Sequence, residues 1–263
     1  MVRVVLGGAT GWTGAPLARA IRDSDDLTLV AAVARRHAGG DLGHVLGEEA
    51  WGVPVMETVE SALAVGADVY IDYTSHAAVR AHVMAALARG VPVVIGSSGL
   101  TGADFEDVER AALAAGVGVI ASGNFAIAAA LAQMAAVSVA RHLPQWEVID
   151  YASDMKPDVP SGTARELAER LSAVHRPAIG VPVDAVAGPR EARGADVDGT
   201  RVHSVRLPGY VVSTDVVFGL HGQRLTIRFE AGESPQPYVD GTLLAVRRVQ
   251  RVQGLIRGLD QLL

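Results

Sequence analysis

The chain of 263 residues has no cysteine, a single asparagine and a single lysine. The absence of cysteine excludes disulfides, thiolate metal sites and cysteine nucleophiles. Of the 23 basic residues, 22 are arginine and the exception is Lys156, so general surface charge does not account for the lysine. Pro157 follows it, which excludes a Gly-Lys-Ser/Thr phosphate loop, and Ala152 excludes a Tyr-x-x-x-Lys dehydrogenase pair.

The sequence also lacks a basic block and a long apolar run. The 23 basic and 29 acidic residues give a net charge of −6, which argues against a nucleic-acid-binding surface. The most apolar stretch, residues 125–140, is rich in alanine and contains Gln133 and Ser138, as expected of a buried helix rather than a membrane span. The opening before Gly7 is too short for the core of a signal peptide. We therefore expect a cytoplasmic protein with neither a nucleic-acid nor a membrane partner.

The first half of the chain alternates short β-branched runs with alanine-rich helical segments. Near-continuous apolar strands separated by helices indicate a parallel sheet that is covered on both faces. The expected strands are 2–6, 27–33, 69–73, 91–95 and 117–121, and the expected helices are 15–22, 76–89 and 103–115.

The pattern changes after Asn124. A long helix is followed by a strand, a turn-rich segment, a second helix and then three more strands, at 203–207, 210–218 and 224–231. We expect a loop over residues 176–199 and helix over the last thirty residues. In the third of these strands, Leu225, Ile227 and Phe229 alternate with polar residues, which predicts one buried and one solvated sheet face. The fold class is therefore α/β, with a nucleotide-binding half joined to an α+β half whose mixed sheet is largely antiparallel.

A glycine-rich run links the first strand to the first helix. Glycines at 8, 11 and 14 form Gly-x-x-Gly-x-x-Gly, a variant of the dinucleotide fingerprint, which allows a pyrophosphate to approach the helix N-terminus. An ordinary turn is the alternative. The second strand is followed by Arg35 and Arg36 and by no carboxylate, which favours the 2′-phosphate of NADPH over NADH. Two solvated arginines are the alternative here.

Three further loops follow strand ends and contain small hydroxyl residues, glycines and the only asparagine. In an open parallel sheet, ligands bind beyond the carboxyl ends of the strands. Asn124 can both donate and accept hydrogen bonds, so it is a candidate anchor for a nicotinamide carboxamide. The cofactor-binding candidates are Gly8, Thr10, Gly11, Trp12, Thr13, Arg35, Arg36, Tyr73, Thr74, Gly96, Ser97, Ser98, Ser122, Asn124 and Phe125.

The segment 154–163 around Lys156 is held irregular by two prolines and a glycine. Thr163 and Glu166 are spaced as a capping box for a helix that we expect at 164–174. Helix-start N–H groups with the hydroxyls of Ser161 and Thr163 would form an anion site beside Lys156. An ammonium can transfer its proton and a guanidinium cannot, which is a reason for lysine at this position. The alternative is a surface lysine in an ion pair with a neighbouring aspartate.

These motifs resemble the dihydrodipicolinate reductase (4-hydroxy-tetrahydrodipicolinate reductase) family of lysine and diaminopimelate biosynthesis. The resemblance covers nearly the whole chain, through the segments 8–14, 72–74, 96–99, 124–125, 156–163 and 203–209. It implies a Rossmann-like dinucleotide-binding domain of residues 1–124 and 235–263. It also implies a substrate domain of residues 125–234 that packs subunits into a homotetramer.

The resemblance further implies hydride transfer from a nicotinamide to a small, cyclic, dicarboxylated imine-like substrate. Lys156 would be the catalytic donor, and Ser161, Gly162 and Thr163 would hold a substrate carboxylate. No metal is expected, because two prolines oppose the helix that would align the nearby aspartates.

The sequence departs from the family at two histidines that precede the lysine. Their positions are Ala152, where the family has its proton-donating histidine, and Ser153, where it has a substrate contact. Either Lys156, Tyr151, Asp154 or water supplies the proton, or the substrate differs. We therefore expect an NADPH-dependent reductase of a C=N or conjugated C=C bond with a distinct substrate. The alternatives are a true 4-hydroxy-tetrahydrodipicolinate reductase, use of NADH, and a non-catalytic NADP(H)-binding regulator.

Overall fold

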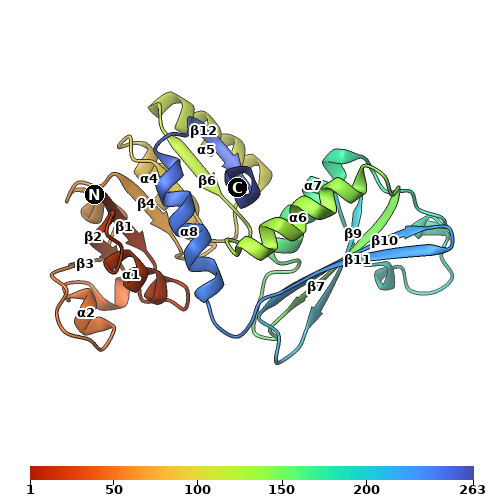
Figure 1. Cartoon of the computed structure of the whole chain (residues 1–263), viewed down its shortest axis with the longest axis horizontal. Coiled ribbons are helices and arrows are strands. Elements are labelled where there is room, and N and C mark those ends of the chain that lie inside the picture. The colour runs from red at the N-terminus through yellow and green to blue at the C-terminus, as the bar shows by residue number, and fades with distance from the viewer. The chain divides into compact units, whose positions relative to one another are not determined.

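The computed structural model describes all 263 residues, which form two compact units (Figure 1). Unit 1 comprises Met1–Ala126 and Pro235–Leu263, and unit 2 comprises Ile127–Ser234. Unit 2 is therefore a continuous insertion, and the chain returns to unit 1 to finish it. No helix combines the length and the apolar character that crossing a membrane would require.

Unit 1 is built on a seven-stranded sheet in which every pair of neighbouring strands is parallel. The order β12-β6-β5-β4-β1-β2-β3 reverses its winding between β1 and β4, which is where doubly wound sheets bind ligands. The strands are β1 Val2–Gly7, β2 Leu27–Val33, β3 Val55–Met56, β4 Val69–Asp72, β5 Val93–Ile95, β6 Gly118–Ala121 and β12 Gly254–Arg257.

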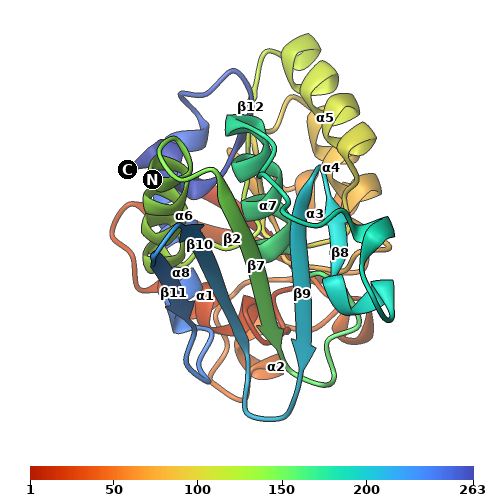
Figure 2. The ribbon, with the colours of Figure 1, turned by 90° about the vertical axis from the view of Figure 1, so that its right-hand side faces the viewer.

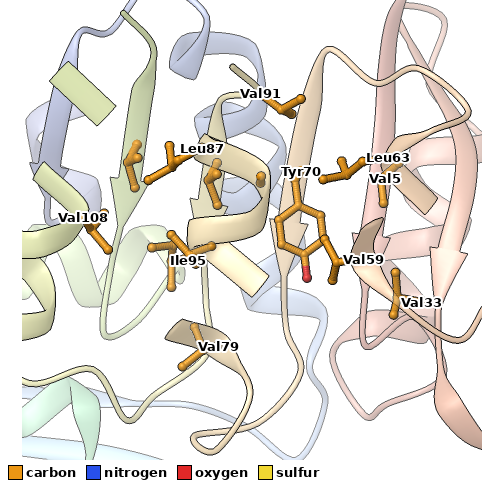
Figure 3. Close-up of a cluster of buried hydrophobic side chains, with 14 of the residues drawn as sticks. Val5, Val33, Val59, Leu63, Tyr70, Val79, Leu87, Val91, Ile95 and Val108 are labelled. Atoms are coloured by element: carbon orange, nitrogen blue, oxygen red, sulfur yellow. The ribbon is translucent and has the colours of Figure 1, made fainter. Parts of the chain in front are cut away.

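Helices cover both faces of this sheet, as predicted. On one face α3, α4 and α5 enclose a core around the buried ring of Tyr70 (Figure 3). On the other face α1 and α8 contact each other and the sheet. The helices are α1 Gly14–Arg22, α2 Leu42–Val45, α3 Val59–Leu63, α4 Val79–Leu87, α5 Gly102–Ala115 and α8 Gln236–Val249, with short 3-10 turns at Arg35–His37 and Leu259–Leu262.

Unit 2 has a five-stranded mixed sheet in the order β11-β10-β7-β9-β8 (Figure 2). Its only parallel pair is β7 with β9, so the sheet is largely antiparallel, as predicted. Helices α6 Ile127–Ala140 and α7 Gly162–Val174 cover one face around a core that contains Trp146 and Phe218. The strands are β7 Gln145–Ala152, β8 Ala195–Val197, β9 Thr200–Arg206, β10 Val212–Leu220 and β11 Gln223–Glu230, and 3-10 turns lie at Val183–Ala185 and Arg190–Arg193.

Three local expectations were wrong. Strand β8 interrupts the predicted loop 176–199, and strand β12 interrupts the predicted C-terminal helix. Both strands have only three or four residues and are ordered by pairing with β9 and β6, a tertiary effect that local sequence does not encode. Leu225 is 41% exposed although its alternation predicted burial, because β11 is an edge strand.

Candidate active site

The glycine-rich turn joins β1 to α1 at the winding reversal of the unit 1 sheet. Gly8 has a φ of +78°, and a Cβ at this position would overlap the carbonyl oxygen of Tyr73, which follows β4. Glycine is therefore needed both for the left-handed backbone and for the close approach of two strand ends. Gly11 closes the turn by donating its N–H to the Gly8 carbonyl at 2.9 Å.

The N-terminus of α1 is open to an anion. Thr13 occupies the cap position but makes no capping hydrogen bond, and the N–H groups of Trp12 and Thr13 have no partner within the chain. Unsatisfied N–H groups and the helix dipole favour negative charge at such a position. Thr10 is half-buried in the turn, while Trp12 is 52% exposed with its ring edge against Tyr238.

The two arginines that were predicted to bind the cofactor lie in the 3-10 turn that follows β2. Arg35 and Arg36 are exposed and form no ion pair within the chain. No carboxylate stands in this turn. Two unpaired guanidiniums at this strand end fit a phosphate better than a ribose hydroxyl.

A buried carboxylate joins two of the predicted cofactor loops. Asp72, at the end of β4, accepts hydrogen bonds from the Thr74 hydroxyl at 2.8 Å and from the Ser97 hydroxyl at 2.5 Å. Its other oxygen accepts from the Tyr70 hydroxyl at 2.7 Å and lies 3.2 Å from Nδ1 of His82. The ends of β4 and β5 are thereby fixed against each other at the winding reversal.

Asp72 remains ionised in spite of its burial. Burial alone would raise its pKa, yet hydrogen bonds from His82, Ser97 and Tyr70 hold that pKa below the usual range. Burial raises the pKa of the Tyr70 hydroxyl, and the neighbouring Asp72 charge adds to the effect. Tyr70 is therefore a permanent donor to the carboxylate. The sequence analysis missed Asp72 and His82, although an aspartate that ends a fully apolar strand is a signal.

Other predicted cofactor residues are engaged in packing within unit 1. The Tyr73 hydroxyl is 2.7 Å from Oγ1 of Thr242 in α8, and its ring meets the buried Phe125 ring edge-on. Asn124 is buried and accepts the Ala126 N–H at 2.8 Å. The remaining predicted loop residues are Gly96 beneath the Tyr73 ring, the exposed Ser98, and Ser122, which donates to the Asn124 carbonyl.

The Lys156 side chain lies in unit 2 and is 27% exposed. Its Nζ forms an ion pair with Oδ1 of Asp158 at 2.9 Å. Asp154 is exposed and accepts a hydrogen bond from the Ser153 hydroxyl at 3.2 Å. The lysine therefore has an internal carboxylate partner, which limits the motion of its side chain.

Helix α7 begins at Gly162, not at residue 164, and the predicted capping box of Thr163 with Glu166 was wrong. Ser161 is the N-cap, and its hydroxyl oxygen accepts the Ala164 N–H at 3.3 Å. The same hydroxyl donates to Asp150 at 2.6 Å. Thr163 is buried inside the first turn, whereas the Gly162 N–H has no partner within the chain.

Asp150 is fully buried on β7 and binds residues that the sequence analysis did not select. It accepts hydrogen bonds from Ser204 at 3.1 Å and from Arg206 at 2.8 Å, both on the parallel neighbour β9. The spacing of 204 and 206 was a usable signal, because residues two apart in a strand share a face.

Tyr151 is excluded as the proton donor that replaces the missing histidine. It lies between Asp150 and Ala152, so its side chain points to the opposite face of the sheet. There its hydroxyl donates to Asp215 at 3.2 Å. Burial and then the Asp215 charge raise the pKa of Tyr151, so it holds its proton.

A cavity of about 900 Å³ lies elsewhere in unit 2. It is lined by strand residues such as Glu147, His203 and Val217 and by the segment 177–187. Neither Lys156 nor any of residues 161–163 lines it.

Comparison with known proteins assigns the whole chain to one family. Residues 2–125 match the family model described as dihydrodipicolinate reductase, N-terminus, and residues 125–263 match the model of its C-terminus. Curated 4-hydroxy-tetrahydrodipicolinate reductases from Moorella thermoacetica and Desulfitobacterium hafniense are 38% and 36% identical, respectively. Each alignment covers 100% of this chain and 98% of the relative.

Solved structures agree with this assignment. Dipicolinate-bound dihydrodipicolinate reductase from Paenisporosarcina sp. TG-14 is 31% identical, with a TM-score of 0.75 and full coverage of both chains. An amine dehydrogenase from Mycobacterium smegmatis, at 16% identity and a TM-score of 0.66, shares the fold, with 97% of this chain and 94% of that chain covered. The chain therefore belongs to the dihydrodipicolinate reductase family and is a nicotinamide-dependent oxidoreductase with a Rossmann-like fold.

Proposed function

We propose that the chain is a 4-hydroxy-tetrahydrodipicolinate reductase, the activity by which its curated relatives are named. The observation that carries the proposal is whole-chain similarity combined with Lys156 in the segment that precedes α7 and an unpartnered Gly162 N–H at the start of that helix. A distinct substrate, our first expectation, rested on the replacement of two family histidines by Ala152 and Ser153 and has less support. A non-catalytic regulator is disfavoured because the curated relatives named above are reductases.

Unit 1 would bind the cofactor, whose nicotinamide supplies the hydride. The open N-terminus of α1 suits a pyrophosphate, and the loops bound by Asp72 suit the ribose and nicotinamide. In unit 2, Gly162 and Thr163 at the start of α7 and the Lys156 ammonium would hold a substrate carboxylate. Ser153 is retained as a substrate-contact candidate.

Lys156 would also donate the proton that the family's histidine, replaced here by Ala152, would otherwise supply. Its Nζ donates to Oδ1 of Asp158 at 2.9 Å, and this contact fixes the position of the donor atom. Asp154 points its carboxylate toward Ser153 and is exposed. Water is the remaining alternative donor.

The test is NADPH oxidation with 4-hydroxy-tetrahydrodipicolinate and a panel of cyclic imino acids. We expect turnover of the lysine-pathway intermediate, and a loss of about 10²–10⁴-fold in kcat/KM for Lys156→Ala, the usual range for a positioned acid. Arg141→Ala, which removes an exposed cation of the same unit, is the matched control. Turnover of another imine only would favour a distinct substrate, and cofactor binding without any turnover would favour the regulator.

We propose a preference for NADPH, supported by the unpaired guanidiniums of Arg35 and Arg36. Serine at both positions should raise the KM for NADPH about tenfold, the size of one lost charge-assisted contact, and leave the KM for NADH unchanged. A lower KM for NADH than for NADPH in the wild-type protein would refute the preference.

The family resemblance also supports a cytoplasmic homotetramer in which residues 125–234 bind substrate and join subunits. The unit 2 sheet face opposite its two helices presents Ile149 and Val217, which suits burial against another copy. Light scattering should therefore give four times the 27.3 kDa chain mass, and a monomer would contradict the proposal.

A further inference from the structure

We propose that Arg206 and Asp150 are positioning residues that preset the start of α7 and the Lys156 segment before any ligand binds. This inference rests on the proposed function, which gives Lys156 and the start of α7 their task. Neither residue needs to touch the ligand. Asp150 acts through Ser161, and Arg206 acts through Asp158, which holds Lys156.

Asp150 fixes the residue that caps the helix. Its Oδ2 accepts the Ser161 N–H at 2.8 Å, and its Oδ1 accepts the Ser161 hydroxyl at 2.6 Å. The carboxylate is fully buried, so water cannot replace these donors. Ser161 is in turn the N-cap of α7, and a central strand therefore dictates where the helix begins.

Arg206 joins this anchor to the lysine segment. Its Nη2 donates to Asp150 Oδ2 and to the carbonyl oxygen of Asp158, both at 2.8 Å. The Asp158 side chain holds Lys156 Nζ at 2.9 Å. Arg206 Nη2 thus links Asp150, which anchors the N-cap of α7, to Asp158, which orients the Lys156 ammonium.

The network also decides which donors remain for a ligand. Ser161 gives its only hydroxyl proton and its N–H to Asp150, so it is an anchor and not a ligand contact. Gly162 has an unpartnered N–H one residue further along, and Lys156 lies on the linked segment. Weakening the network should therefore reduce carboxylate affinity without deleting a ligand contact.

The test is Arg206→Lys in the full-length protein saturated with NADPH. Lysine keeps the charge, but an ammonium on a flexible stem lacks the second nitrogen, Nη1, which holds the guanidinium in place by donating to the Val205 carbonyl at 3.0 Å. The probe is dipicolinate, the dicarboxylate in the solved structure of the Paenisporosarcina relative. We expect its calorimetric Kd to rise about tenfold, as for one lost charge-assisted hydrogen bond, and amide exchange at Gly162 and Thr163 to accelerate without ligand.

Arg201→Lys is the matched control. Arg201 lies on the same strand with the same 15% side-chain exposure and pairs with Asp196, but it lines the cavity on the opposite face. The Kd of the Arg201→Lys variant for dipicolinate and its amide hydrogen exchange at residues 162–163 should match those of the wild type. Identical behaviour of the two lysine variants would overturn the proposal.

A milder variant covers the case in which Arg206→Lys does not fold. Ser204→Ala removes one 3.1 Å bond to Asp150 and should weaken dipicolinate binding about two- to threefold, as expected for one neutral donor. An unchanged Kd with unchanged exchange would again overturn the inference. Failure of the wild type to bind dipicolinate would instead refute the proposed function, and the ligand-free exchange comparison would still decide the positioning role.

Discussion

Asp72 in unit 1 and Asp150 in unit 2 are fully buried, and each lies at or near the carboxyl end of a parallel strand. Their charges are compensated differently. Hydroxyl groups and an imidazole surround Asp72, whereas an arginine fork and two serines surround Asp150. A buried carboxylate left without its donors is strongly destabilising, so each aspartate enforces the geometry of the loop that supplies those donors.

The Asp72 network should make stability depend on pH in the acid range. Because the folded pKa of Asp72 is lowered, its contribution is fully present above the unfolded pKa of about 4 and is lost as the pH falls through the folded value. Asp72→Asn should reduce the free energy of unfolding by about 2 kcal/mol near neutrality, the range for hydrogen bonds to a charged group.

Urea unfolding of both proteins from pH 3 to pH 8 tests this expectation. The difference in the free energy of unfolding between the wild type and Asp72→Asn should be constant above about pH 5 and should narrow below about pH 4. Tyr70→Phe keeps the Asp72 charge but removes one of the donors that lower its pKa, so its stability should depend on pH less steeply than that of the wild type and more steeply than that of Asp72→Asn. A gap that is independent of pH would show that the effect of Asp72 is steric.

Among the elements, the strand–turn–helix of β1 and α1 constrains the sequence most tightly. Gly8→Ala would place a methyl group against the Tyr73 carbonyl at a φ of +78°. We expect a loss of about 3 kcal/mol from left-handed strain and overpacking together. Cofactor affinity should fall as well, because the turn and the end of β4 would separate.

Gly90→Ala is the control for this substitution. Gly90 has a φ of +68°, but a Cβ there would meet nothing within 4 Å. It should lose only about 1 kcal/mol from backbone strain and leave the Kd for NADPH unchanged. Equal losses in the two variants, measured by thermal melting and fluorescence titration, would contradict the role given to the Tyr73 carbonyl.

The start of α7 shows where prediction from sequence reached its limit. Thr163 with Glu166 fitted the capping pattern, yet the chain uses Ser161. The deciding interaction comes from Asp150, eleven residues earlier on a strand. The spacing of residues in the sequence does not predict this contact, because it forms only when β7 and α7 pack together. Tyr151 is the opposite case, because strand alternation alone could have excluded it as the proton donor.

At the scale of the whole molecule, the alternation of apolar strands and helices was sufficient to predict the parallel sheet of unit 1 and the largely antiparallel sheet of unit 2, whereas the mixed character of the second sheet came from the family resemblance. Lys156 and the glycine turn, on which the proposed function depends, could be selected from the sequence because they are compositional or local signals. The buried networks around Asp72 and Asp150 were not found, because their members come together only through strand order and register.

The C-terminal segment should be indispensable for cofactor binding. Strand β12 pairs with β6, and Thr242 of α8 bonds to Tyr73 beside the glycine turn. A chain that ends at Ser234 should lose NADPH binding and aggregate, because the edge and apolar face of the sheet become exposed. Titration and size-exclusion chromatography test this, with an internal deletion of residues 187–188 from the loop of unit 2 as a control that keeps cofactor affinity. Retained affinity in the truncated chain would contradict the role of α8.

The discontinuous course of unit 1 sets an order of events during synthesis. Strand β6 is synthesised before unit 2 and β12 after it, so the edge of the nascent sheet stays open while residues 122–253 are made, 108 of which form unit 2. Unit 2 is continuous in the chain and can fold during that interval, whereas unit 1 closes only at termination. We expect nascent chains that end at residue 234 and are followed by a linker long enough to fill the ribosomal exit tunnel to be protease-resistant in unit 2 and sensitive in unit 1, and the reverse pattern would contradict this order.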